Sequence, residues 1–218
     1  MTDPADSASI LHPIRFLQAV GRVFIAFLAT AGRLTLFTIE GTSHCFRAPW
    51  YFRIIGRQMV EIGYYSLPVV GLTAVFAGMV LALQTYIGAS RFSAEGAIAN
   101  IVVVALTREL GPVLAGLMVA GRIGAAMAAE IGTMRVTEQI DALSTLSTNP
   151  MKYLVAPRII AGVLTLPLLV LVGDIIGVMG GYLVGVYRLD FNPSAYVQQT
   201  WAFVETLDVM SGLVKAAV

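Results

Sequence analysis

The chain has 218 residues, 57% of them hydrophobic and 12% charged, and a formal net charge of +1. Soluble domains carry about 25% charged residues, so this composition excludes an ordinary soluble domain and indicates an integral membrane protein. The near-neutral charge gives no support for nucleic-acid binding, and the single cysteine, Cys45, excludes an intrachain disulfide and a multi-cysteine metal site.

The N-terminal part is predicted to lie on the membrane surface. Residues 1–11 are polar, with no basic region before the first apolar run, which predicts a disordered terminus and no cleaved signal peptide. From about residue 13 to residue 40 the pattern is helical, with Arg15, Arg22 and Arg33 close to one line along the helix. Arginines spread along the length favour an amphipathic helix in the membrane interface. A tilted span with snorkelling arginines is the alternative.

Residues 41–60 contain aromatic residues and several arginines, so we predict a cytoplasmic connection at the level of the lipid headgroups. His44 lies beside Cys45, but no carboxylate or third ligand is placed nearby, which favours packing or surface roles over a thiol–imidazole site. We therefore expect an interfacial helix and connection over residues 12–60, followed by a bundle of transmembrane helices from residue 61 to residue 218.

The first clear span runs from about residue 62 to residue 87, which is long enough to cross a bilayer. Gln84 and Tyr86 lie in its last turns, and Arg91 follows it. These side chains either anchor the end of the span at the membrane interface, as aromatic and arginine residues commonly do, or line the polar mouth of a cavity.

The next apolar stretch, from about residue 97 to residue 120, carries two charges near its middle. An arginine at the bilayer centre costs about 2.5–3.5 kcal/mol, so Arg108 should face protein or a cavity. Glu109 follows it directly, and adjacent residues on a helix do not face each other, so each charge needs another partner. Pro112 can bend the helix and free backbone groups beside the pair. The two charges either lock helices together or face a ligand.

A segment with one acidic and one apolar face follows at residues 130–143, when the residues are placed at about 100° each. The pattern predicts a short amphipathic helix on the membrane surface whose charges meet a soluble partner; an ordinary solvated helix is the alternative. The acidic face holds Glu130, Met134, Thr137, Glu138 and Asp141, and the apolar face holds Val136, Ile140 and Leu143.

The run LTRELGPVLAGLMVAGRIGAAMAAEIGTMRVTEQIDAL resembles the signature region of MlaE-type (YrbE-type) permeases, the membrane subunits of lipid-transporting ABC systems. The resemblance includes polar positions at fixed spacing and extends more loosely from about residue 12 to the C-terminus. It implies a bacterial inner-membrane protein with phospholipid as cargo, moved between the inner and outer membranes and so affecting outer-membrane asymmetry. It also implies a cytoplasmic P-loop ATPase partner and a periplasmic MCE-domain partner.

The third span runs from about residue 158 to residue 187. Its glycines recur at intervals of four, at 173 and 177 and again at 181 and 185, a spacing that lets helices approach closely. Asp174 lies inside the span, where it either bonds to a neighbouring helix or serves as a proton or headgroup site.

Residues 188–206 are polar again and include a short helix around Trp201, and another helix begins near Leu207. The residues from 207 to 218 are too few to cross a bilayer. Members of the family that the chain resembles have about five spans, and there this helix continues and one more span follows. We therefore expect the sequence to be a shortened form of a longer chain.

Lysine and arginine residues concentrate before the first span and between the second and third spans, which predicts that the N-terminus and the acidic segment are cytoplasmic. The sequence contains no G-x-x-x-x-G-K-[ST] loop and no H-E-x-x-H or G-x-S-x-G motif. We therefore predict that the chain is not an enzyme and holds no metal or cofactor, and that the partner ATPase binds ATP and Mg²⁺.

Our leading hypothesis is a homodimeric permease, because one chain of this size encloses too little space for a two-tailed lipid. Arg108 would bind the lipid phosphate through charge-assisted hydrogen bonds, and Glu109 would meet a headgroup amine or Lys215. A proton-coupled carrier of a small solute, using Asp174 and Glu109, and a membrane scaffold that transports nothing are the alternatives. The residues assigned to the periplasmic mouth are Gln84, Tyr86 and Arg91. A coupling helix at 128–146 would dock on the ATPase through Glu130, Arg135, Glu138 and Asp141.

Overall fold

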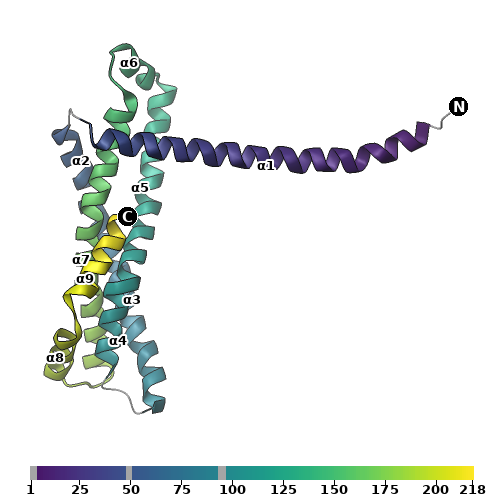
Figure 1. The fold of residues 1–218 in the computed structure, drawn as a ribbon. Helices are drawn as coiled ribbons and strands as arrows, with labels where there is room; N and C mark the ends of the chain where they lie inside the picture. Colours follow the sequence, from purple (N-terminus) through teal and green to yellow (C-terminus); the bar gives the residue numbers. More distant parts are fainter. Residues whose placement is uncertain (1–3, 48–50, 93–96) are drawn as a thin grey trace. The chain divides into compact units, whose positions relative to one another are not determined.

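The computed structural model describes residues 4–47, 51–92 and 97–218 (Figure 1). These residues form helices and connecting turns with no strand among them, so the predicted all-α fold is confirmed. The chain divides into two compact units, Met1–Ala48 and Pro49–Val218. In the described parts, four helical segments are long and apolar enough to cross a membrane: Leu17–Cys45, Phe52–Ala89, Ile98–Val136 and Met151–Tyr187.

The first unit is one helix, α1 (Pro4–Cys45). Pro4 stands in its first turn, where the missing N–H of proline costs no hydrogen bond. The prediction of disorder over residues 1–11 is therefore wrong from residue 4 onward, and residues 1–3 lie outside the described part. Hydroxyl groups along α1 donate to carbonyls three or four residues back, which satisfies them within the helix and suits apolar surroundings. These hydroxyls belong to Thr30, Thr35, Thr38, Thr42 and Ser43.

The second unit begins with α2 (Phe52–Ile62), a 3₁₀ turn at Tyr64–Ser66 and α3 (Leu67–Ala89). The connection predicted over 41–60 is wrong for most of its length, because α1 and α2 occupy all but its middle; residues 48–50 are outside the described residues. The buried side of α2 holds Ile55, Gln58 and Ile62, so its arginines lie on the other side and do not oppose helix formation.

The second helical segment contains α4 (Ile98–Ala105), a π-helical turn (Leu106–Leu110) and α5 (Gly111–Val136). It extends well past the predicted end near residue 120. The amphipathic helix predicted over 130–143 is also wrong in extent, because α5 ends at Val136 and α6 covers only Gln139–Thr145. Glu138, with φ 56°, separates the two helices, and a side-chain pattern alone does not reveal such a break.

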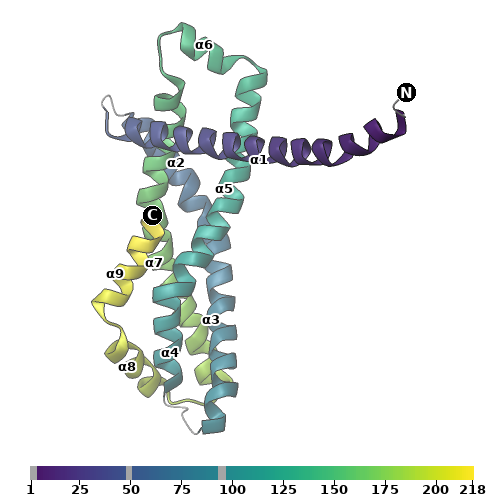
Figure 2. The ribbon, with the colours of Figure 1, turned by 45° about the vertical axis from the view of Figure 1, so that its right-hand side comes forward.

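The third segment contains a π-helical turn at Met151–Val155 and α7 (Ala156–Tyr187), close to its predicted bounds. It is followed by α8 (Pro193–Phe203) and α9 (Thr206–Ala217). The Asn192 side chain caps α8 by accepting from the backbone N–H of Ser194 at 3.0 Å. Within the second unit, α6 and α8 lie toward opposite ends, and α9 runs along the bundle (Figure 1, Figure 2).

Helices α3 and α7 make the most extensive contact in the described part of the bundle. A Cβ at Gly78 would collide with the carbonyl of Gly177, and one at Gly180 would collide with that of Val75. A Cβ at Gly177 would lie 3.2 Å from the carbonyl oxygen of Ala74. The close approach that we predicted from the glycine spacing is confirmed, and it allows van der Waals contact between backbones where lipid provides no hydrophobic drive.

Candidate functional site

The two charges within the second span lie on the π-helical turn between α4 and α5. Pro112 has no N–H, so the carbonyl of Arg108, four residues earlier, lacks its usual partner within the helix. Lys215 of α9 replaces that partner, with its Nζ 2.9 Å from the carbonyl oxygen of Arg108. The backbone group that proline frees therefore receives a hydrogen bond from another helix, as apolar surroundings require.

Helix α9 also supplies a partner for each charged side chain. Lys215 Nζ lies 2.7 Å from Glu109 Oε1, and Arg108 Nε lies 3.4 Å from Asp208 Oδ1. Gly212 stands between the two α9 partners, and a Cβ there would collide with the backbone of the π turn. The close fit of α9 against the turn is what allows both ion pairs to form.

Asp208 is a member of this cluster that our sequence reasoning did not assign. It is buried, and its Oδ2 accepts a hydrogen bond of 3.3 Å from the backbone N–H of Glu205, as part of the capping box that begins α9. A sequence signal was present, because Asp208 and Lys215 lie about two turns apart on one face of α9. Opposite charges on one face of an apolar helix need partners as much as Arg108 and Glu109 do.

The charged cluster is not sealed among packed helices. The side chains of Arg108 and Glu109 are 54% and 68% exposed, whereas that of Asp208 is only 11% exposed. The ion pairs therefore hold α9 against the π turn and still leave two charged groups accessible. The sequence suggested that Arg108 and Glu109 either lock helices together or face a ligand. In this arrangement they can do both.

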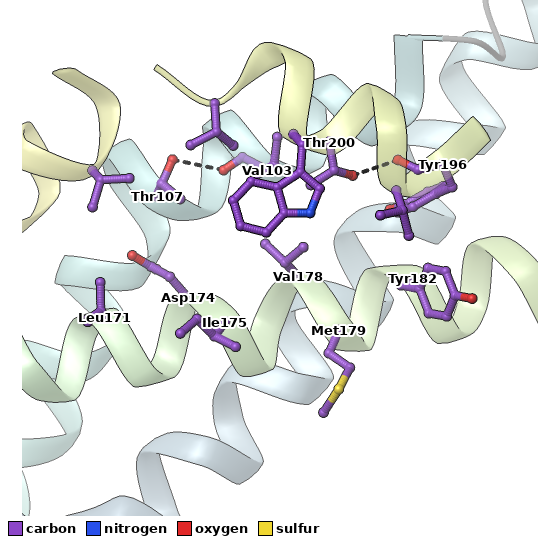
Figure 3. A pocket seen from close by; sticks show the side chains of 14 residues that line it. Val103, Thr107, Leu171, Asp174, Ile175, Val178, Met179, Tyr182, Tyr196 and Thr200 are labelled. Atoms are coloured by element: carbon purple, nitrogen blue, oxygen red, sulfur yellow. Dashed lines mark hydrogen bonds between the residues drawn. The ribbon is translucent and has the colours of Figure 1, made fainter. Parts of the chain in front are cut away.

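An apolar cavity of about 480 Å³ lies beside the π turn, between α4, α7, α8 and α9 (Figure 3). Thr107, which precedes Arg108, lines the cavity, and its hydroxyl donates to the carbonyl of Val103 at 2.9 Å. Figure 3 shows Ile175 and Val178 of α7 along the facing wall. Thr107 lines the cavity, whereas Arg108 and Glu109, the next two residues of the turn, do not.

Asp174 is the carboxylate on the wall of this cavity. Its Oδ1 is buried and has no hydrogen-bond partner in the part of the chain that the structure describes. The side chain packs against α5, where a Cβ at Gly111 would collide with it. Asp174 therefore touches a neighbouring helix without the bond that we considered, and it remains a candidate site residue.

The three residues predicted to line a periplasmic mouth are all described, and none of them lines the apolar cavity. Tyr86 packs edge-on against Phe191, with ring centroids 6.1 Å apart. Gln84 and Arg91 are exposed at the end of α3 and in the 3₁₀ turn that follows it. The structure does not join these residues to the charged cluster in this single chain.

The four residues predicted to dock a soluble partner fall into two groups. Glu130 is half exposed, at 51%, and forms an ion pair with Arg158 of α7, whose side chain is only 7% exposed. Arg135 and Asp141 form an exposed ion pair of 2.9 Å that bridges the end of α5 and α6. Glu138 lies between them, exposed and in the left-handed region. The last three form a polar tip at one end of the second unit.

Taken together, the site offers an apolar cavity and an accessible set of opposite charges, which suits a molecule with hydrocarbon chains and a charged headgroup. Within the described residues, no group of three or more His, Cys, Asp or Glu side chains could hold a metal ion.

The chain is similar to proteins of a known family. Residues 55–218 match the family model described as Permease MlaE. A probable ABC transporter permease protein of Rickettsia conorii is 62% identical over 201 residues, covering 92% of this chain and 78% of the relative. The intermembrane phospholipid transport system permease protein MlaE of Haemophilus influenzae is 35% identical over 208 residues, covering 93% and 78%. The chloroplastic protein TRIGALACTOSYLDIACYLGLYCEROL 1 of Arabidopsis thaliana is 34% identical over 190 residues, covering 86% and 52%.

Proposed function

Because the chain belongs to the MlaE permease family of ABC transporters, we propose that it is the membrane subunit of a system that moves phospholipids between the inner and outer membranes of a bacterium. The name of the Haemophilus relative supports phospholipid as cargo. The multi-pass helical architecture supports a place within a membrane, which we assign to the inner membrane, with the N-terminus in the cytoplasm.

The observation that carries this proposal is the accessible charged cluster next to an apolar cavity. The Arg108 side chain is more than half exposed, and its guanidinium can donate to a lipid phosphate in a charge-assisted, bidentate manner. Glu109 and Lys215 offer both signs of charge to the rest of a headgroup. Acyl chains would extend along the apolar wall that Thr107 and Ile175 help to form.

The remaining parts of the system are partners in this proposal. A cytoplasmic P-loop ATPase binds ATP and Mg²⁺ and docks on the polar tip formed by Arg135, Glu138 and Asp141, with Glu130 transmitting its motion to α7. A periplasmic MCE-domain protein receives or delivers lipid near Gln84, Tyr86 and Arg91. Two copies of the chain build the transport cavity between them.

The test of the lipid site is Arg108→Ala in the complex reconstituted with its partners. Loss of the guanidinium and its charge-assisted hydrogen bonds to phosphate is expected to lower the rate of lipid transfer and the amount of co-purified phospholipid at least roughly tenfold. Lipid transfer between donor and acceptor vesicles and mass spectrometry of bound lipid measure the two effects.

Asp208→Asn is the matched control, because it removes the ion-pair partner of Arg108 and leaves the guanidinium in place. We expect this variant to keep most of the bound lipid. Unchanged lipid transfer in Arg108→Ala, or an equal loss of bound lipid in both variants, would assign Arg108 to holding α9 rather than to the cargo.

Glu138→Lys tests the docking tip. Reversing one exposed charge at an interface is expected to weaken ATPase association roughly fivefold to tenfold, because like charges then meet across the contact. Glu138→Gly is the control, since it removes the charge and suits the left-handed backbone. Co-purification of the ATPase measures the effect, and a fully active complex carrying Glu138→Lys would contradict the proposed docking site.

A further inference from the structure

A second, polar cavity of about 420 Å³ lies between α2, the end of α5 and the beginning of α7. It is distinct from the apolar cavity, with which it shares no residue. All of its lining residues stand near one end of the three candidate spans Phe52–Ala89, Ile98–Val136 and Met151–Tyr187. Its charged members are Arg53, Arg57, Glu61, Glu130 and Arg158.

Arg158 is the central side chain of this cavity. It is 7% exposed, and its Nη2 donates to Glu130 Oε2. Its Nη1 is buried and receives no hydrogen-bond partner from the described part of the chain. A guanidinium carries five donors and a permanent charge, and leaving a buried charged donor without an acceptor is costly. Arg158 therefore has binding capacity that the protein itself leaves unused.

The balance of charge in the cavity favours an anion. Three arginines face two carboxylates, and Glu130 is already paired with Arg158. Arg53 and Arg57 stand one helical turn apart on the exposed side of α2, so both can reach the same ligand. Gln58, which is buried in the same wall, adds an amide that can donate a hydrogen bond.

The position of the cavity indicates where such an anion comes from. Tyr153 lines the cavity and packs edge-on against Tyr51, with ring centroids 5.4 Å apart. Exposed Tyr64 and Tyr65 lie in the turn that ends α2. Tyrosines concentrate at the level of the lipid headgroups, and the cavity stands at the ends of the spans, where that level is reached.

We propose that this cavity binds the phosphate group of an anionic lipid headgroup, held by the guanidinium groups of Arg53, Arg57 and Arg158. Planar guanidinium groups match phosphate oxygens in a bidentate manner, and arginines near a membrane surface attract anionic lipids. This lipid is a resident of the bundle end and is separate from the cargo at Arg108. The site goes beyond the proposed transport function and does not depend on it.

The test is a titration of the purified full chain in detergent with fluorescent phosphatidylglycerol, in the Arg108→Ala background so that binding at the proposed cargo site is weakened. The double change Arg53→Gln and Arg57→Gln is expected to weaken binding roughly tenfold, since each surface arginine contributes to the attraction. Both side chains are exposed, so the variant should fold, which its thermal unfolding temperature checks.

Arg188→Gln is the matched control, because Arg188 is also exposed but follows the other end of α7. We expect it to bind phosphatidylglycerol as tightly as the parent. Equal affinity of the double variant and the parent would overturn the proposal, and so would an equal loss in Arg188→Gln. Phosphatidylcholine, which has no net charge, should compete weakly, and strong competition by it would also count against an anion site.

Inorganic phosphate, tested at constant ionic strength, distinguishes the two sources of this chemistry. Failure of free phosphate to displace the lipid would support the headgroup as ligand. If free phosphate displaces the lipid from the parent but not from the double variant, the site binds phosphate, and free phosphate rather than a lipid is its ligand. Arg158→Lys adds a second check, because it keeps the charge but removes the planar fork, and undiminished affinity in that variant would remove Arg158 from the site.

Discussion

Replacing Glu130 with alanine is expected to destabilise the bundle by about 2 kcal/mol, because it leaves the buried side chain of Arg158 without this acceptor. The pair is only half buried, because the Glu130 side chain is itself 51% exposed, so we expect a cost below that of breaking a fully buried pair. For a chain of this length the loss corresponds to a fall of roughly 4–8 °C in the temperature of thermal unfolding in detergent.

The matched control is Asp141→Ala, which breaks the Arg135–Asp141 pair. Both of its side chains are more than 60% exposed, at 66% and 61%, so the cost should be below about 1 kcal/mol. Adding Arg158→Met to Glu130→Ala should recover part of the stability, because the double variant buries no unpaired charge. A loss in Glu130→Ala no greater than that in Asp141→Ala would contradict this account of Arg158.

Replacing Gly78 with alanine is expected to cost about 3 kcal/mol, the upper end of the usual range for overpacking, by forcing α3 and α7 apart. The added Cβ would collide with the backbone carbonyl of Gly177, which cannot change rotamer to avoid it. The same displacement would separate Gly180 from Val75, so the whole contact between the two helices is affected. Thermal unfolding in detergent measures the loss.

Gly88 provides the control on the same helix, because a Cβ there meets nothing within 4 Å. Gly88→Ala is expected to be neutral or to stabilise α3 by about 0.5–1 kcal/mol, since alanine loses less backbone entropy than glycine in a helix. If Gly78→Ala and Gly88→Ala unfolded at the same temperature, close packing at Gly78 would not contribute to the stability of the bundle.

The positions of the long helices could be predicted because each depends on its own segment. The third span was placed within a few residues, since length and continuous apolarity are properties of residues 156–187 alone. The limits of α1, α2 and α5 were wrong because charged residues were taken as boundaries. On α2 the arginines lie opposite the buried side, so the helix continues through them.

The site was predicted in part. The sequence indicated that Arg108 and Glu109 each needed another partner and that Pro112 would free a backbone group. Lys215 is the partner both of the Glu109 carboxylate and of the freed Arg108 carbonyl. It did not indicate Asp208 as the partner of Arg108. Glu130 was assigned to an acidic surface, yet it pairs with a buried arginine, because periodicity gives a face of a helix without saying what that face meets.

The sequence by itself determined that the chain is a helical membrane protein, where most of its spans lie and which buried charges demand partners, because hydrocarbon imposes these requirements on each segment separately. Only the tertiary structure shows which groups are the partners of those charges. The contact between Lys215 and Glu109 joins residues 106 positions apart. Such contacts, like the apolar cavity beside Thr107 and the polar cavity around Arg158, depend on how the helices rotate and pack against one another. The apolar character of a segment determines neither its rotation nor its packing partners.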